Sequence, residues 1–279
     1  MENKKQIVEK LTAYVERIGS QNKAAKTMKG VSAATISQMI NGNWDKIAEE
    51  MWKKVAVAVG ADDSRWNVAE TVAYLQLNTF MEGVQKQSRV MAITAPAGSG
   101  KTFASKCYEQ SHKNVYRLMC NEFWSKNDFV NELLRAMGVK CDGYTKSERL
   151  NVICENLEKQ NHPLLIFDEF DKLNDNVWQF LITIYNRLED QCGIIVLSTD
   201  YIQKRMHNGL RWNKKGYPEI YSRMGSKFVE LKKISYEDVK LICENNGVTD
   251  EAVIEDIARD SEGDLRRVRQ MVFGKKNAA

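Results

Sequence analysis

The sequence has little of what several common classes of protein require. Its 279 residues include three histidines, and because none stands at metal-ligand spacing, a structural zinc site is not expected. The six cysteines are scattered without a C-x-x-C pair, which is typical of reduced thiols in the cytoplasm. No apolar run approaches the ~20 residues of a membrane span, and the N-terminus lacks the apolar core of a signal peptide. We therefore expect a cytoplasmic protein with no membrane partner.

Charge is unevenly distributed along a chain whose formal net charge is +4. Residues 1–60 hold 10 Lys and Arg against 6 Asp and Glu, and residues 199–233 hold 9 against 3. Two basic segments in an otherwise neutral chain favour contact with a polyanion such as nucleic acid. Solvated charge is the commoner reason for any single lysine, so the segments indicate a partner and not a particular contact.

The strongest motif is a glycine-rich turn between a predicted strand and a predicted helix. An apolar run at 90–94 leads into Ala95-Pro96-Ala97-Gly98-Ser99-Gly100-Lys101-Thr102, and residues 103–110 can continue as a helix. This context is typical of a phosphate-binding loop, because backbone N–H groups and the helix N-terminus point into one concavity. We expect residues 96–102 to bind ATP, with Lys101 reaching the β- and γ-phosphates and the Thr102 hydroxyl a ligand of Mg²⁺.

The motif departs from the usual pattern G-x-x-x-x-G-K-[ST] at its first position, which is Ala95. That position makes the turn out of the strand, so the substitution weakens the match without removing the part that contacts phosphate. The alternative interpretation is a chance turn rich in Gly and Ser, and a second site argues against it.

The second site is a pair of carboxylates at the end of another predicted strand. Asp168 and Glu169 follow the apolar run 164–167, as at the carboxyl end of a strand buried on both faces. We expect Asp168 to hold Mg²⁺ through its water shell and Glu169 to orient the attacking water for γ-phosphate hydrolysis. Thr199, or Ser198 beside it, ends the next strand and can sense the γ-phosphate; the alternative is an ordinary strand-end cap.

Strands and helices alternate over the larger part of the chain. Predicted strands lie at 90–94, 115–119, 163–167, 193–197 and 227–231, and predicted helices at 67–87, 126–137, 147–160, 177–190, 235–246, 250–260 and 263–273. This alternation indicates a doubly wound α/β domain with a parallel sheet, which binds its ligands at the carboxyl ends of the strands.

The first 60 residues predict a separate all-α domain. Helical patterning at 5–18, 21–28 and 32–42, with a turn at Gly30, resembles the helix-turn-helix of the phage-repressor-like family. Ser32 can cap the second helix of the motif, while Ile36 and Ile40 face inward. The exposed face would present Ser32, Ala33, Thr35, Ser37 and Gln38 to DNA. Because Gln38 is the main base reader and no Arg is present, weak or non-specific duplex binding is favoured; a packing module without a DNA role is the alternative.

Two arginines complete a resemblance to the AAA+ ATPases. Arg223 in Ser222-Arg223-Met224-Gly225 and Arg266 in Gly263-Asp264-Leu265-Arg266 are similar to the arginine finger and the second sensor of that superfamily. The resemblance implies that Arg223 acts in trans on a neighbouring subunit and Arg266 in cis, with Arg205 and Arg211 as rival fingers. It further implies a small helical lid, so we expect domains at 1–62 (helix-turn-helix), 63–233 (AAA+ P-loop core) and 234–279 (lid).

A repressor-like domain ahead of a compact AAA+ domain resembles the phage Mu B family of transposition activators. That likeness implies an ATP-dependent filament or ring on double-stranded DNA, delivery of target DNA to a transposase, and a bacterial host cytoplasm. Lys126, Lys204, Arg205 and the pair Lys214-Lys215 are then candidate DNA contacts. Two alternatives remain open: an ATP-switched transcription regulator and a loader of a replicative helicase.

Overall fold

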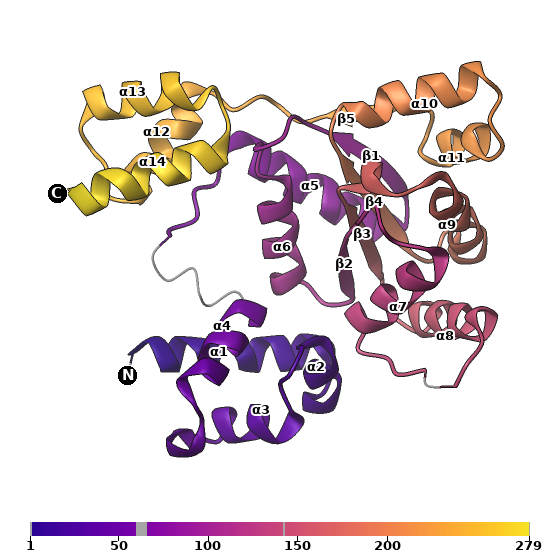
Figure 1. Ribbon diagram of the computed structural model, residues 1–279, viewed down its shortest axis with the longest axis horizontal. Coiled ribbons are helices and arrows are strands. Elements are labelled where there is room, and N and C mark those ends of the chain that lie inside the picture. Colours follow the sequence, from indigo (N-terminus) through magenta and orange to yellow (C-terminus); the bar gives the residue numbers. More distant parts are fainter. Residues whose placement is uncertain (1, 60–65, 142, 279) are drawn as a thin grey trace.

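A five-stranded parallel sheet lies at the centre of the computed structural model, which describes residues 2–59, 66–141 and 143–278 (Figure 1). Its strands are β1 (Val90–Thr94), β2 (Val115–Met119), β3 (Leu164–Asp168), β4 (Gly193–Ser198) and β5 (Phe228–Glu230). They stand in the order β2-β3-β4-β1-β5, with every pair parallel. The predicted α/β fold is confirmed, and each predicted strand ends within one residue of the observed one.

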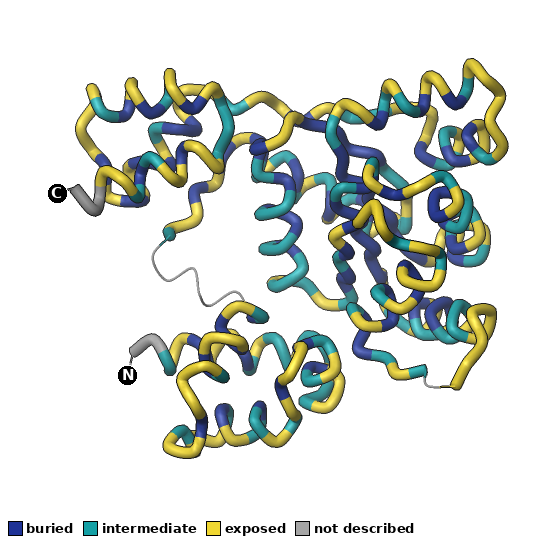
Figure 2. The backbone as a smooth tube through the Cα atoms, viewed as in Figure 1, coloured by how far each residue is buried: buried dark blue, intermediate teal, exposed yellow. Residues whose placement is uncertain are grey.

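Helices cover both faces of this sheet, because its central strands are apolar on both sides and every residue of β3 and β4 is buried (Figure 2). On one face, α5 (Val72–Gln87) and α6 (Lys101–Ser111) pack against the sheet through residues such as Leu77 and Tyr108. The other face packs against α7 (Lys126–Ala136), α8 (Lys146–Glu158) and α9 (Asp175–Leu188) through a core that includes Phe129 and Trp178. The carboxyl edge of the strands stays open for a ligand.

The segment between β4 and β5 contains two helices that the sequence analysis did not predict. They are α10 (Tyr201–Arg211) and α11 (Tyr217–Arg223), and one-turn 3-10 helices also occur at η1 (Trp44–Lys46) and η2 (Phe170–Lys172). Helix α10 buries only Ile202, Met206 and Gly209. Few of its residues are apolar, and one of the three buried positions is glycine, so the segment is polar overall although its apolar residues share one face.

Three further helices, α12 (Tyr236–Asn245), α13 (Glu251–Ser261) and α14 (Leu265–Ala278), form a small bundle, called the lid here. Their apolar core also takes in Ala69. The prediction that α5 begins near residue 67 is therefore wrong. Residues 66–71 are not helical, because Asn246 of the lid exchanges hydrogen bonds with the Asn67 backbone and Thr71 caps α5 at Val72.

The N-terminal module, residues 2–59, consists of α1 (Glu2–Ile18), α2 (Gln21–Thr27), α3 (Ala33–Ile40) and α4 (Glu49–Val59) around a core of its own. Ser32 caps α3 by accepting from the Thr35 N–H, as predicted, and Gly30 turns the chain with a φ of 77°. Ile36 is buried as predicted, but Ile40 is only half-buried and Met39 fills the core in its place.

The predicted boundary at 61–67 falls mainly on residues 60–65, which lie outside the described residues, so the domain limits remain a prediction. Among the helices that the structure describes, none is both long and apolar enough to cross a membrane.

Helix α10 offers a test of the fold that uses one glycine. A Cβ at Gly209 would overlap the ring of Tyr217 on α11, so Gly209→Ala should destabilise the protein by about 1–3 kcal/mol through overpacking. Gly83 on α5 has no atom within 4 Å of its Cβ position, so Gly83→Ala should stabilise by about 0.5–1 kcal/mol. Chemical denaturation of both variants measures the difference. Equal stabilities would contradict the α10–α11 packing.

Candidate nucleotide-binding site

A cavity of about 570 Å³ lies at the carboxyl edge of the sheet, between the P-loop domain and the lid. Its lining comes from the segment 66–77, the P-loop with the start of α6, the end of β3 and the residues after it, the end of β4, and the first turns of α14, together with Leu231 and Ile242. Its lining includes every residue from Ala97 to Thr102, together with Asp168, Glu169, Thr199 and Arg266. The structure therefore brings these predicted site residues together around one space.

The phosphate-binding loop has the backbone that the motif requires. Gly98 and Gly100 have φ angles of 78° and 87°, in the left-handed region that favours glycine. Gly100 is also the N-cap of α6 and offers no side-chain cap, so the first N–H groups of the helix face the loop. Ala95 is buried and has no positive φ, which explains why alanine is tolerated where the usual motif has glycine.

Lys101 is folded against the loop that it belongs to. Its Nζ donates to the Ala95 carbonyl at 2.6 Å, to the Pro96 carbonyl at 2.9 Å and to the Ser99 hydroxyl at 3.3 Å. Burial lowers the pKa of Lys101, while the nearby carboxylate of Asp168 opposes that shift. The ammonium group thus stands partly desolvated in the site, where a phosphate would add favourable negative charge.

Asp168 is buried at the end of β3 and is held by an arginine that the sequence analysis did not single out. Arg117 Nη1, from β2, lies 3.2 Å from Asp168 Oδ2. Burial raises the pKa of Asp168, whereas Arg117 and a hydrogen bond from Thr102 lower it. A charged residue at the centre of the apolar strand 115–119 was the available signal for Arg117.

Glu169 and Thr199 are both engaged within the chain. The Glu169 carboxylate accepts from Lys172 Nζ at 2.6 Å, and its own φ of 54° is left-handed. The Thr199 hydroxyl donates to Asp171 at 2.8 Å, and the buried Ser198 hydroxyl donates to the Thr199 carbonyl. Asp171, which sequence analysis missed, therefore holds the residue that we expect to sense the γ-phosphate.

The lid contacts the phosphate-binding loop directly. The Leu265 N–H at the start of α14 donates to the Gly98 carbonyl at 2.9 Å. The Asp264 carboxylate lies so close to Gly98 that any Cβ there would overlap it. Arg266 is exposed, lines the cavity and acts electrostatically on Lys101. This position agrees with a lid arginine that reaches a nucleotide in cis.

Arg223 lies away from the cavity of its own chain. Its guanidinium donates to Asn186 Oδ1 of α9 at 2.6 and 2.9 Å and to the Glu219 carbonyl, and it borders a small space lined by Val90 and Ile194 at the opposite ends of their strands. A role in the site of the same chain is excluded by this placement. A role in trans stays a prediction.

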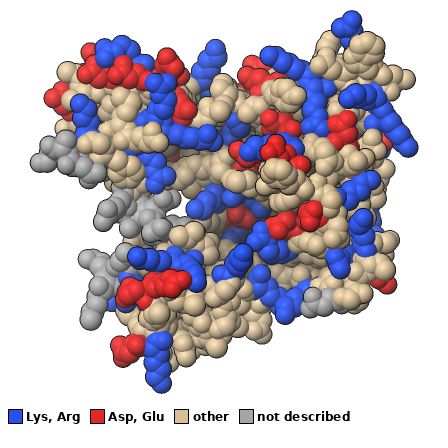
Figure 3. Space-filling view, in the orientation of Figure 1, with Lys and Arg blue, Asp and Glu red and all other residues tan. Residues whose placement is uncertain are grey.

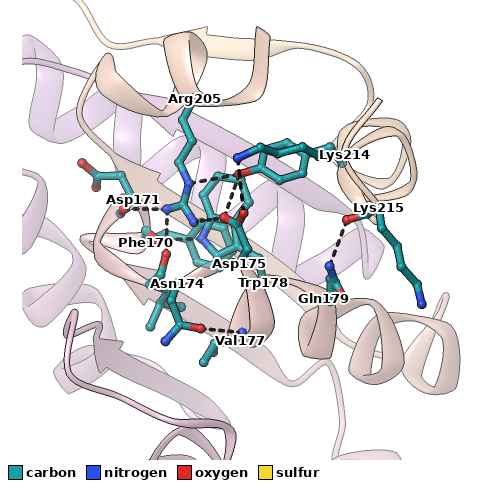
Figure 4. Close-up of polar contacts among 12 residues, drawn as sticks. Phe170, Asp171, Asn174, Asp175, Val177, Trp178, Gln179, Arg205, Lys214 and Lys215 are labelled. Carbon is teal, nitrogen blue, oxygen red and sulfur yellow. Dashed lines mark hydrogen bonds and ion pairs between the residues drawn. The ribbon is translucent and has the colours of Figure 1, made fainter. Parts of the chain in front are cut away.

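Arg205 is a structural residue, which corrects its prediction as a DNA contact and as a rival finger. Its guanidinium donates to the Asp171 and Leu173 carbonyls and to Asp175 Oδ1, and lies 3.8 Å from the Trp178 ring centroid (Figure 4). Its guanidinium is thus engaged inside the α9–α10 junction, and its side chain is only 15% exposed. Arg211 remains exposed, beside Trp212.

The other predicted DNA contacts lie on three separate surfaces. Ser32 and Gln38 of α3 are exposed, whereas Thr35 and Ser37 are half-buried and Ser37 accepts from Asn41. Lys126 is the first residue of α7, three residues after Phe123 in the sequence, and Phe123 is 84% exposed. The exposed Lys204, Lys214 and Lys215 belong to the α10–α11 region, where basic side chains gather on the upper right of the molecule in Figure 3.

The residues at the site fit Mg²⁺ held with a nucleotide better than a metal held by protein alone. Thr102 and Asp168 are within hydrogen-bond reach of each other, and they offer oxygen ligands. No group of three or more His, Cys, Asp or Glu side chains within the described ranges could hold a metal ion. Mg²⁺ commonly keeps several waters and takes phosphate oxygens, which suits a site with so few protein ligands.

Comparison with known proteins agrees with this geometry. Residues 84–206 match the family model described as AAA domain. The chain is 24% identical over 253 residues to the Mu-like prophage FluMu DNA transposition protein B of Haemophilus influenzae, covering 86% of each chain. It is 24% identical over 180 residues to the chaperone protein ClpB of Clostridium tetani, covering 62% of this chain and only 20% of that protein.

Among solved structures, Cdc6p from Pyrobaculum aerophilum aligns with a TM-score of 0.52 and 15% identity over 73% of this chain and 62% of that chain. At that identity the likeness shows the fold alone. The P-loop, the buried aspartate of β3, the sheet order and the matched segment lead to one conclusion: the chain has a P-loop NTPase-type α/β fold, residues 84–206 are similar to the AAA domain, and the chain resembles the Mu-like transposition protein B.

Proposed function

We propose that the protein is an ATPase that, when bound to ATP, binds duplex DNA without sequence specificity and assembles along it. It then delivers this DNA as a target to a transposase. Hydrolysis drives disassembly. The observation that carries this proposal is the convergence of Lys101, Asp168, Thr199 and Arg266 on one cavity of nucleotide size. The similarity to a protein named for DNA transposition, over 86% of both chains, supports the choice of partner.

The residues around the cavity are suited to ATP hydrolysis. Bound ATP with Mg²⁺ supplies a triphosphate that is polarised for attack by water. Lys101 exchanges its contacts with the Ala95 and Pro96 carbonyls for phosphate oxygens. Glu169 exchanges its ion pair with Lys172 for the attacking water and orients that water. Arg266 contacts the phosphates from the lid, because the hydrogen bond between Leu265 and Gly98 holds the start of α14 beside the P-loop.

The position of Arg223 supports the proposal that several subunits assemble. Since its guanidinium lies at the end of the sheet opposite the P-loop, it can meet a triphosphate only in a second subunit. A site that is completed in trans makes assembly depend on ATP, because the nucleotide then contacts both subunits.

The proposed DNA contacts lie on separate surfaces, two of which combine basic and aromatic side chains. Phe123 and Lys126 follow β2, and Trp212, which is 71% exposed, stands with Lys214 and Lys215 at the turn between α10 and α11. Flexible lysines contact phosphates without reading bases. This composition favours non-specific duplex binding, and the α3 face with Gln38 is a further contact of the same kind.

The first prediction of this proposal concerns ATP binding. Lys101→Ala removes a charged donor to the phosphates and should weaken ATP binding by about ten- to one-hundredfold, since a charged hydrogen bond contributes about 1.5–3 kcal/mol. The wild type should co-sediment with random-sequence duplex DNA in ATP and release it in ADP. The variant should fail to bind in either nucleotide.

The matched control is Lys54→Ala, because Lys54 is half-exposed on α4 and paired with Glu50. It should leave ATP binding unchanged. DNA binding that is equal in ATP, in ADP and for Lys101→Ala would refute the proposal. A preference of about 10³ or more for one DNA sequence would instead support a transcription regulator.

The second prediction concerns the trans arginine. Arg223→Ala should bind ATP normally but lose most hydrolysis, because an arginine finger contributes about 10³-fold or more to turnover. Mixed with Lys101→Ala, it should regain activity, because some interfaces then pair an intact P-loop with an intact Arg223. Steady-state phosphate release from each variant and from the mixture measures this.

Arg211→Ala is the comparison for this experiment, because Arg211 is the other exposed candidate for the finger. It should hydrolyse ATP like the wild type. An inactive mixture, or full activity of Arg223→Ala alone, would rule out Arg223 as the finger.

A further inference from the structure

The N-terminal module is seated on the P-loop domain at two points. Arg17 Nη1, near the end of α1, donates to the Glu109 carbonyl on α6. The Lys23 carbonyl of α2 lies 2.9 Å from where a Cβ would stand on Gly138, just after α7. Gly138 has a φ of 67° and thus lets the two backbones approach. Figure 1 shows the module below α6, on the side of the sheet that carries the lid.

A row of alternating charges leads from the first of these contacts to the magnesium site. Arg17 acts electrostatically on the Glu109 carboxylate. Glu109 Oε2 lies 3.7 Å from Arg117 Nε, and Glu109 Oε1 accepts from the Arg117 N–H at 3.1 Å. Arg117 in turn holds Asp168 at 3.2 Å. The side chains of Glu109, Arg117 and Asp168 are 23%, 14% and 1% exposed, so water screens them little.

Arg117 stands between two carboxylates and is hydrogen-bonded by its side chain to only one of them. The 3.7 Å to Glu109 is too long for a hydrogen bond, and Arg117 Nε has no hydrogen-bond partner among the described residues. A small shift would satisfy that donor on Glu109, at the expense of Asp168. Burial raises the pKa of Glu109, and Arg117 and then Arg17 lower it, so both cations act on the same carboxylate.

We propose that docking of the N-terminal module restrains magnesium binding through Arg17, Glu109 and Arg117. Seated Arg17 shares the charge of Glu109, which leaves Arg117 on Asp168, where it competes with Mg²⁺ for that carboxylate. When the module leaves, Glu109 draws Arg117 to itself and Asp168 is free for Mg²⁺. The inference rests on the proposed ATP site. By linkage, Mg²⁺ with ATP then favours release of the module to the same degree.

The test measures the free Mg²⁺ concentration needed for half-maximal tightening of a fluorescent ATP analogue on the full chain. Arg17→Ala removes the charge and Gly138→Ala pushes the module away by contact with Lys23, so both should lower that concentration by about fivefold or more. Binding of the analogue in EDTA should stay unchanged, because the relay acts on the metal ligand alone. Arg17→Lys keeps the charge and should stay close to the wild type.

Glu109→Gln distinguishes an effect passed through Arg17, Glu109 and Arg117 from a general loosening of the N-terminal module. Without the carboxylate, Arg117 stays on Asp168, so adding Arg17→Ala or Gly138→Ala to this variant should have no further effect. Lys54→Ala, in the same module, should match the wild type. An unchanged Mg²⁺ requirement in Arg17→Ala would overturn the inference, as would an equal effect of Arg17→Ala with and without Glu109. Binding of the analogue in EDTA shows separately that the nucleotide site exists, and its loss in the wild type would refute the proposed function and the inference together.

Discussion

The parallel register of β1, β3 and β4 is the constraint on which the rest of the structure depends. Thr94 pairs with Ser198, and Phe167 with Val196, so the residues that follow the three strands emerge at one edge. The P-loop, Asp168 with Glu169, and Thr199 come from parts of the chain that are far apart in sequence. A shift of one residue in either pairing would turn these side chains to the other face of the sheet.

The site holds two buried charged side chains, and the free energy of removing them from water must be offset by the surrounding fold. Lys101 and Asp168 are both buried, and each is kept in place by a partner that a bound nucleotide would replace or rearrange. A buried pair of charges contributes little net stability, because desolvation consumes most of the attraction. The arrangement is therefore better explained by ligand binding than by stability, since a phosphate and a divalent cation would complete both halves of it.

Much of this was predictable from the residues, because strands that are apolar on both faces and glycines before Lys-Thr are strong local signals. The five strands, the P-loop backbone and the Ser32 cap were of this kind. Arg117 and Asp171 were not found, since their importance comes from contacts with residues far away in sequence, Asp168 and Thr199, which sequence spacing does not reveal. Arg205 was misassigned for the same reason: a lysine- and arginine-rich segment looks solvated until Trp178 and Asp175 are seen to enclose one of its members.

The contact between the lid and the P-loop joins two parts of the candidate nucleotide site. The same few residues of α14 that touch Gly98 also carry Asp264 and Arg266, one negative and one positive, beside the loop where phosphates bind. A triphosphate at the loop would be repelled by the carboxylate and attracted by the guanidinium, so its charge would act on the lid at the N-terminus of α14. Ala69 lies in the core of the lid and Asn67 is hydrogen-bonded to Asn246, so the segment before α5 is tied to the lid as well.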